Sequence, residues 1–136
     1  MTEENIVSII RHKRQYESQI AILRDCIDDL SDPEQPAQAY RYAILRRRIT
    51  LIDYWTAILP DAEKTVVEKK LIEGLSWRGL ANYFAKHEEW DISCDERTLQ
   101  RTFAKAIKRI GCFVDVHFKD GLDYLIETGE ETTESI

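Results

Sequence analysis

The N-terminal part of the chain carries apolar side chains at alternating steps of three and four residues. Between residues 4 and 30 this seam has eight positions, and Lys13 is the polar one. The seven others are apolar or aromatic: Ile6, Ile9, Tyr16, Ile20, Leu23, Ile27 and Leu30. A repeat of 3.5 residues favours a helix that packs along its length against another helix. We therefore predict a helix over residues 4–30.

A second long helix is predicted over residues 37–59. The two prolines of the segment 31–36 cannot continue the first helix, so they mark the turn before the second. Two adjacent apolar stripes follow, formed by Tyr40, Ile44, Leu51, Tyr54 and Ile58 and by Leu45, Ile49, Ile52, Trp55 and Leu59. Because this surface is too broad for one partner, we expect an αα-hairpin with the first helix and further packing behind it.

The N-terminal seam has two candidate partners. A second copy of the chain would make it the interface of a homodimer through residues 6–30, with Lys13 as the polar position that sets the register. Alternatively, the helix over residues 37–59 covers the seam, because a short turn favours antiparallel neighbours. We expect the dimer and keep the hairpin as the alternative.

Shorter helices are predicted in the second half of the chain. Pro60 and the acids after it favour a helix start, and Val66, Val67, Leu71 and Ile72 give that helix its buried side. Gly74 suits a C-terminal cap, and Ser76 suits the N-cap of a fourth helix that ends before a loop at 87–91. Ser93 and Glu96 form a capping box that starts a fifth helix at Ser93.

The fifth helix is predicted to continue to about residue 110. Its inward positions follow the three-four rule: Leu99, Phe103, Ala106, Ile107 and Ile110. After Gly111, apolar and polar residues alternate through Phe118, which indicates either a short strand or further helix. Leu122, Leu125 and Ile126 indicate a last helical turn. We predict an all-α protein with a hairpin at 1–58, a helical module at 59–111, an extension at 112–128 and an acidic tail at 129–136.

Net charge alone argues against a polyanionic partner, since it is −6 over 136 residues. However, residues 119–136 hold six acids and one lysine and thus supply −5 of it. The remainder contains three basic clusters: Arg11 with Lys13 and Arg14; Arg41 with Arg46, Arg47 and Arg48; and Arg97, Arg101, Lys105, Lys108 and Arg109. Local clusters decide whether phosphate can bind, so a nucleic-acid partner stays open.

Other classes of protein lack their usual signatures. No apolar run approaches the length of about 20 residues that spans a membrane, and no secretory signal pattern opens the chain, so we expect a cytoplasmic protein. Cys26, Cys94 and Cys112 form no Cys-x-x-Cys pair, and His87 has no second histidine at zinc-ligand spacing. We predict no catalytic residues, no metal site and no cofactor, because no nucleophile or phosphate-loop motif occurs.

One stretch resembles a known DNA-binding module. Its motifs are Leu59-Pro60-Asp61-Ala62-Glu63, Gly74-Leu75-Ser76, Leu80-Ala81, Ile92-Ser93 and the basic segment that ends Ala106-Ile107-Lys108-Arg109-Ile110. They resemble the helix-turn-helix of sigma factor region 4, and with the hairpin before it the chain is similar to the ArpU/RinA group of phage late-gene regulators. Residues 85–92 form an insertion relative to that pattern, and Gly79 replaces its usual acidic residue.

The resemblance implies which residues contact DNA. Glu96, Arg97 and Gln100 match base-facing places of the sigma pattern, and Arg101 lies beside them in the exposed first two turns. Lys105, Lys108 and the pair Trp77-Arg78 are better placed for phosphate. Small Ala81 would let the recognition helix cross closely over the helix before it.

These residues predict a sequence-specific, phage- or prophage-encoded transcriptional regulator that binds promoter or operator DNA through residues 93–110. Double-stranded DNA is the expected partner, with RNA polymerase as a second candidate. Two alternatives remain: the DNA-recognition subunit of a phage packaging motor, similar to small terminase subunits, and a helical adaptor or inhibitor that binds no DNA. A ring of eight or more subunits would indicate packaging, and binding to a basic protein would indicate the adaptor.

Overall fold

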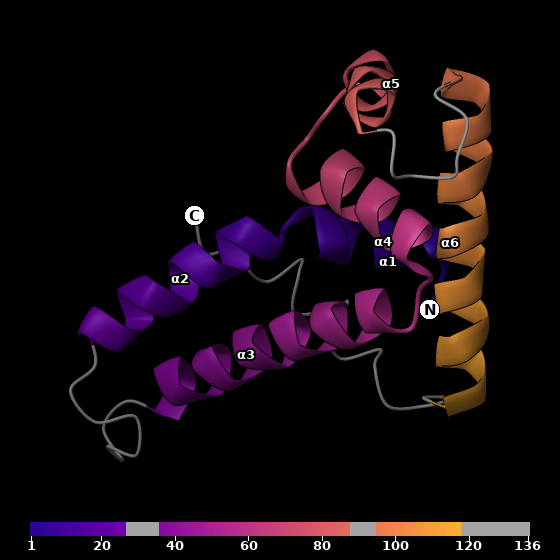
Figure 1. The fold of residues 1–136 in the computed structure, drawn as a ribbon. Coiled ribbons are helices and arrows are strands. Elements are labelled where there is room, and N and C mark those ends of the chain that lie inside the picture. The colour runs from indigo at the N-terminus through magenta and orange to yellow at the C-terminus, as the bar shows by residue number, and fades with distance from the viewer. Residues whose placement is uncertain (27–35, 88–94, 118–136) are drawn as a thin grey trace.

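The computed structural model describes residues 1–26, 36–87 and 95–117. Every regular element in these ranges is helical, which confirms the predicted all-α class (Figure 1). In chain order the elements are α1 (Glu3–Arg11), α2 (Lys13–Cys26), α3 (Pro36–Ala57), α4 (Asp61–Val67), the π-helix η1 (Glu68–Ile72), α5 (Trp77–Lys86) and α6 (Glu96–His117).

The predicted helix over residues 4–30 is wrong in one respect, because the chain leaves the helix at His12. There the backbone N–H bonds to the Ile9 carbonyl oxygen at 3.3 Å, and α1 and α2 run in different directions (Figure 1). The reason is tertiary: Ile6 and Ile10 of α1 are fully buried in a core shared with α6, whereas α2 packs along α3. One straight helix could not serve both partners.

The described part of the N-terminal seam is mostly buried within a single copy of the chain, with Tyr16 and Leu23 partly buried. Ile6, Ile9 and Ile20 expose 7% of their surface or less. Lys13 is also paired internally, with its Nζ 2.9 Å from Oδ1 of Asp53 on α3. Side chains that are already buried cannot form a second interface without rearrangement, so the structure favours the intrachain hairpin over a dimer through residues 6–30.

The α2–α3 hairpin contains a buried cation. The Arg48 side chain is 1% exposed, and its guanidinium lies 5.0 Å from the centre of the Tyr16 ring. Burial lowers the pKa of Arg48, with a smaller opposing effect from Tyr16, while burial raises the pKa of Tyr16. The aromatic face thus offers the buried cation an electrostatic partner between the two helices.

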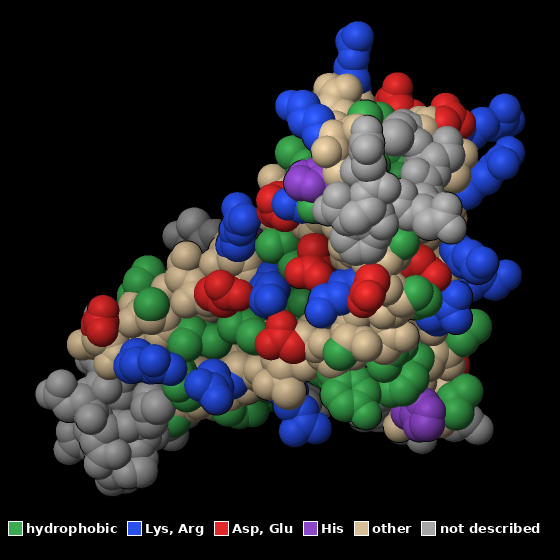
Figure 2. Space-filling model, viewed as in Figure 1, with side chains coloured by type: hydrophobic (Ala, Val, Ile, Leu, Met, Phe, Trp, Pro, Cys, Tyr) green, Lys and Arg blue, Asp and Glu red, His purple; other side chains and the backbone are tan. Residues whose placement is uncertain are grey.

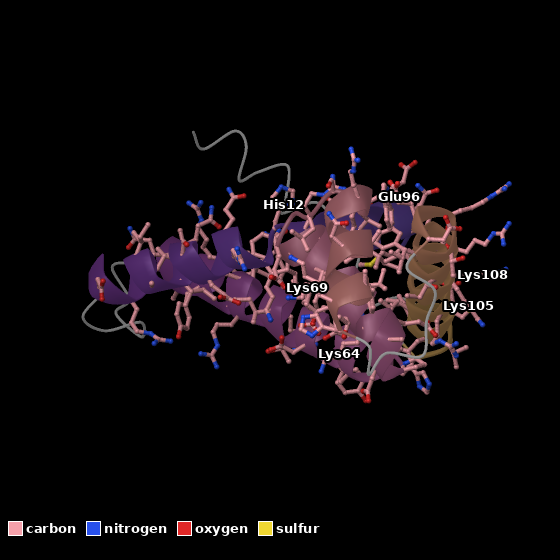
Figure 3. The ribbon with its side chains drawn as sticks, turned by 45° about the horizontal axis from the view of Figure 1, so that its top comes forward. His12, Lys64, Lys69, Glu96, Lys105 and Lys108 are labelled. Atoms are coloured by element: carbon pink, nitrogen blue, oxygen red, sulfur yellow. The ribbon has the colours of Figure 1, made fainter. Side chains whose placement is uncertain are left out.

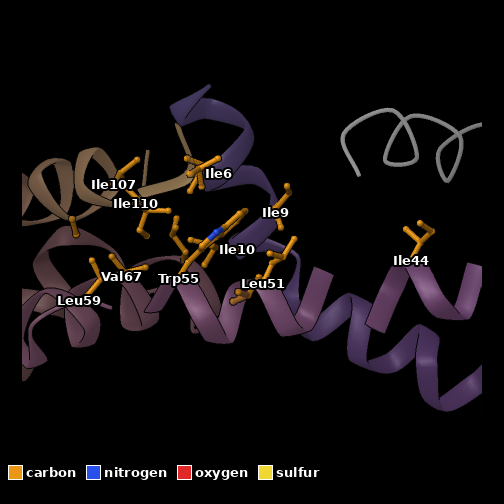
Figure 4. Packing of buried hydrophobic residues seen from close by; sticks show 14 residues of the cluster. Ile6, Ile9, Ile10, Ile44, Leu51, Trp55, Leu59, Val67, Ile107 and Ile110 are labelled. Carbon is orange, nitrogen blue, oxygen red and sulfur yellow. The ribbon is translucent and has the colours of Figure 1, made fainter. Parts of the chain in front are cut away.

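A central core joins the two halves of the sequence. It draws buried residues from α1, α3, η1 and α6 and from the end of α4, with Trp55 fully buried among them (Figure 4). Ile6 and Ile10 reach it from the N-terminal side, and Ile107 and Ile110 reach it from α6. The core therefore includes residues of both predicted segments, 1–58 and 59–111.

Of the two alternatives left open after Gly111, residues 112–117 form the helix and not the strand, because α6 continues through Gly111 to His117. Val114 is 2% exposed in the core, and the Phe113 ring lies 5.5 Å from the Tyr54 ring of α3. Val114 fits a strand alternation and also continues the helical spacing of Ile107 and Ile110, which explains the misleading pattern. The helical turn predicted at Leu122–Ile126 and the acidic tail at 129–136 lie outside the described residues.

Candidate nucleic-acid interface

The turn from η1 into α5 is built as the sequence predicts. Gly74 has φ of +72°, the left-handed conformation in which glycine pays no side-chain penalty, and the Leu75 N–H then bonds to the Lys69 carbonyl oxygen at 3.1 Å. Ser76 caps α5, since its Oγ accepts a hydrogen bond from the Gly79 N–H at 3.0 Å. The predicted roles of Gly74 and Ser76 are confirmed.

Helices α5 and α6 cross steeply over a small core of their own. In Figure 1, α5 is seen almost end-on beside the first turns of α6, which is seen from the side. Leu80 and Phe84 of α5 are buried with Leu99 of α6 and Val66 of α4, and Ala81 is partly buried against this cluster. The predicted helix-turn-helix requires two crossing helices of this kind.

The link between the two helices is longer than the usual three or four residues. Helix α5 ends at Lys86 and α6 begins at Glu96, so most of the predicted insertion at 85–92 lies between them. The predicted helix start at Ser93 moves to Glu96, and Ser93 itself lies outside the described residues. Asp95 precedes the helix instead: its carbonyl oxygen accepts from the Leu99 N–H at 3.0 Å, and its carboxylate accepts from the Thr98 hydroxyl at 3.4 Å.

One face of α6 presents cations to solvent. All six predicted contact residues of this helix are exposed: Glu96, Arg97, Gln100, Arg101, Lys105 and Lys108. Figure 2 shows Lys and Arg side chains along the outer edge of α6, and Figure 3 shows Lys105 and Lys108 pointing away from the body of the protein. Arg97, Arg101 and Lys105 follow one another at steps of four residues, so they form a positive row.

Trp77 and Arg78, predicted together as phosphate contacts, have different surroundings. The Trp77 ring is partly buried, packs edge-on against Phe103 of α6 at 5.6 Å, and has Lys70 Nζ 4.9 Å from its centre. Arg78 is exposed at the start of α5. Trp77 therefore links α5 to α6 and η1, while Arg78 is the residue of the pair that faces solvent.

A long-range ion pair holds α6 against α4. Arg109 Nε and Nη2 donate to the two carboxylate oxygens of Glu63 at 3.2 and 3.1 Å, and Glu63 is 7% exposed. The Glu63 carboxylate raises the pKa of Arg109. In the sequence, Arg109 belongs to a basic cluster and Glu63 to a helix start, and no local pattern links residues 46 positions apart.

Helix α1 flanks the C-terminal half of α6. A groove of about 620 Å³ between them is lined on the α1 side by Glu3, Glu4 and Arg11 and on the α6 side by Ala104 and Lys108. The two glutamates place negative charge beside Lys108. The first half of α6, from Arg97 to Lys105, is thus the part of the cationic face that lies away from these two glutamates.

Within the described residues, the structure offers neither a metal-binding cluster nor a membrane-spanning helix. Across residues 1–26, 36–87 and 95–117, no three His, Cys, Asp or Glu side chains lie close enough together to hold a metal ion. No helix in the same ranges has the length and apolar character needed to cross a membrane. Comparisons with family models, curated proteins and solved structures find no match to this chain.

Proposed function

We propose that this protein binds double-stranded DNA by placing the first half of α6 in the major groove. The observation that carries the proposal is the exposed row of Arg97, Arg101 and Lys105 on a helix held across the capped helix α5. An α-helix fits the major groove of B-DNA, and the first turns of a recognition helix are the ones that reach base edges.

The exposed side chains of α6 suit two kinds of contact. Arg97 and Gln100 carry the donor groups that pair with guanine and adenine, and Glu96 can accept from the cytosine amino group. Lys105 and Lys108 lie further along α6, and Arg78 lies at the start of α5. These exposed cations suit phosphate contacts that position the protein. The interface thus combines sequence reading with backbone binding.

The biological role follows from the resemblance to sigma factor region 4 and to phage late-gene regulators. We propose a non-enzymatic transcriptional regulator that acts in the cytoplasm on promoter or operator DNA, with RNA polymerase as a second partner. The crossing of α5 and α6 and the cap at Ser76 support this role, because a helix-turn-helix needs two crossing helices with the second one exposed.

Salt-dependent binding to a mixed-sequence duplex tests the phosphate contacts. The affinity of the wild-type protein should fall linearly with salt on a log-log plot, because bound cations release counterions from DNA. Lys105→Ala and Lys108→Ala should each flatten this slope by roughly 0.9, one phosphate contact each. Arg14→Ala, an exposed cation on α2, is the control that removes the same charge elsewhere and should leave the slope unchanged.

Two results would count against the proposed interface. One is a wild-type protein that shows no affinity for duplex DNA at low salt. The other is an equal effect of Arg14→Ala and Lys105→Ala, which would show that overall charge and not the α6 face determines binding.

A further inference from the structure

Helix α3 has a largely exposed face, at whose C-terminal end Phe113 of α6 packs against Tyr54. In Figure 1, α2 lies along one side of α3, and Glu17 and Ile20 of α2 border one edge of this face. Ala43, Thr50 and Ala57 are exposed along its centre, at intervals of seven residues. Tyr54 is 53% exposed on the same face, and a hollow of about 740 Å³ there is lined by Ala43, Arg46, Arg47, Thr50 and Tyr54 among others.

The residues that flank this centre line complement one another. Arg46 and Asp53 lie on one flank, where both border a second hollow with Thr50, and the Asp53 side chain is 60% exposed. Arg47 and Tyr54 lie on the other flank. Each flank therefore carries an arginine and, seven residues or about two helical turns later, a side chain that can bind an arginine: an aspartate on one flank and a tyrosine on the other.

We propose that this face of α3 binds the same face of a second copy of the chain, with the two helices antiparallel and a two-fold axis beside Thr50. In such a pair, positions whose numbers add up to about 100 lie opposite each other. Arg46 then meets Asp53 of the second copy, and Arg47 meets the face of its Tyr54 ring. By symmetry each of these contacts occurs twice.

The centre of the face suits a close approach of two helices. Ala43 lies opposite Ala57 of the second copy, and Thr50 lies opposite itself. Their small side chains let two helix backbones pack closely, so the long flanking side chains can reach across. An unrelated helix would lack the matched Arg46–Asp53 and Arg47–Tyr54 contacts. A second copy of the chain is therefore the occupant that this face fits.

The internal contacts of these residues are compatible with the dimer. Tyr54 packs against Phe113 within the chain and remains 53% exposed. Asp53 bonds to Lys13 through Oδ1, which leaves Oδ2 for Arg46 of the second copy. Arg46 lies 5.9 Å from the Tyr42 ring and remains exposed. Ile6, Ile9 and Ile20 of the N-terminal seam are buried within one chain, so this face replaces the seam as the proposed dimer interface.

Charge reversal at the two flanking positions tests the proposal, with the mass in solution as the readout. Arg46→Asp places two aspartates opposite each other at each contact, and Asp53→Arg places two arginines opposite each other. We expect each single variant to dimerise at least about tenfold more weakly than wild type. The double variant restores both pairs in reversed orientation, and an equimolar mixture of the two single variants restores them in a heterodimer.

Sedimentation equilibrium from about 1 to 500 μM covers the affinity range of a modest interface. Wild type, the double variant and the mixture should reach twice the chain mass of 16.0 kDa. Each single variant alone should stay nearer to the mass of one chain. Circular dichroism of each variant checks that the helices are intact.

Three results of the mass measurements would overturn the proposal. These are a wild-type mass of 16.0 kDa throughout, a dimer that both single variants leave unchanged, and a ring of eight or more copies. No DNA is present in these measurements, so their failure leaves the DNA-binding proposal standing, and loss of DNA binding leaves this one standing. Loss of DNA affinity in Arg46→Asp with an unchanged mass would instead assign α3 to nucleic acid and reject the dimer.

Discussion

Trp77 and Arg78 show how neighbouring residues take different roles. The Trp77 ring packs against Phe103 and under Lys70, so Trp77→Ala removes contacts that join α5 to α6 and η1. We expect it to lower the free energy of unfolding by about 2 kcal/mol, less than for a fully buried aromatic. Arg78→Ala should change it by no more than about 0.5 kcal/mol, since the side chain is exposed, and should weaken DNA binding. Urea unfolding and duplex binding measure both quantities, and a reversed order of stability effects would contradict these assignments.

Tyr16 provides a pH-dependent prediction. Burial raises its pKa above the usual 10.0, so the neutral phenol is favoured in the folded state. Its contribution to stability is fully present below pH 10.0 and is lost as the pH rises toward the folded pKa. Tyr16→Phe keeps the ring beside Arg48 and cannot ionise. The stability of wild type relative to this variant should be constant below pH 10 and fall above it, and urea unfolding at several pH values checks this.

Residue roles set by local geometry were predictable from the sequence, and those set by distant partners were not. Ser76 and Gly74 act through neighbours within a few residues, and both predictions hold. The pairing of Glu63 with Arg109 links two helices across 46 positions, so no local pattern contains it. The exposure of Arg97 and Gln100 followed from helical spacing, whereas their contact with DNA stays a prediction.

Gly111 and Gly74 offer a matched pair of substitutions, one inside a helix and one after a helix end. Gly111 lies inside α6, and a Cβ there would meet its nearest neighbours at 3.9 Å or more, which is ordinary contact. Gly111→Ala should therefore raise the free energy of unfolding by about 0.5–1 kcal/mol. Gly74 has free space around it but a φ of +72°, so Gly74→Ala should lower the same quantity by about 1 kcal/mol. Thermal unfolding compares the two, and the same sign for both would contradict the helical extension through Gly111.

The bounds of the helices show where sequence patterns stop being informative. Pro36 at the first position of α3 and Pro60 at the N-cap of α4 marked these helix starts locally. The break at His12 arises because α1 and α2 have different partners. Helix α6 continues past Gly111 because its residue Val114 is buried in the central core. Both depend on which elements meet in the folded protein, so the seam at 4–30 and the alternation after Gly111 indicated the wrong bounds.

At the scale of the whole molecule, one core joins the N-terminal helices to the proposed DNA-binding helices. Ile10 of α1 is fully buried in the same cluster as Ile110 of α6. We expect a single cooperative unfolding transition. Ile10→Ala should lower the free energy of unfolding by about 2–5 kcal/mol. Tryptophan fluorescence and circular dichroism should give coincident curves. Two separate transitions would show that the helical module at 59–111 folds independently of the hairpin.

The most direct test of the central claim is the enrichment of bound sequences from a pool of random DNA duplexes. If α6 reads base edges, wild-type protein should enrich a common short sequence. Arg97→Ala and Gln100→Ala should each bind that sequence more weakly by about 1–3 kcal/mol and should relax the preference at particular base pairs. Arg14→Ala should enrich the same sequence as wild type. Enrichment of no common sequence, or of the same sequence by all of these proteins with equal affinity, would contradict sequence reading by α6.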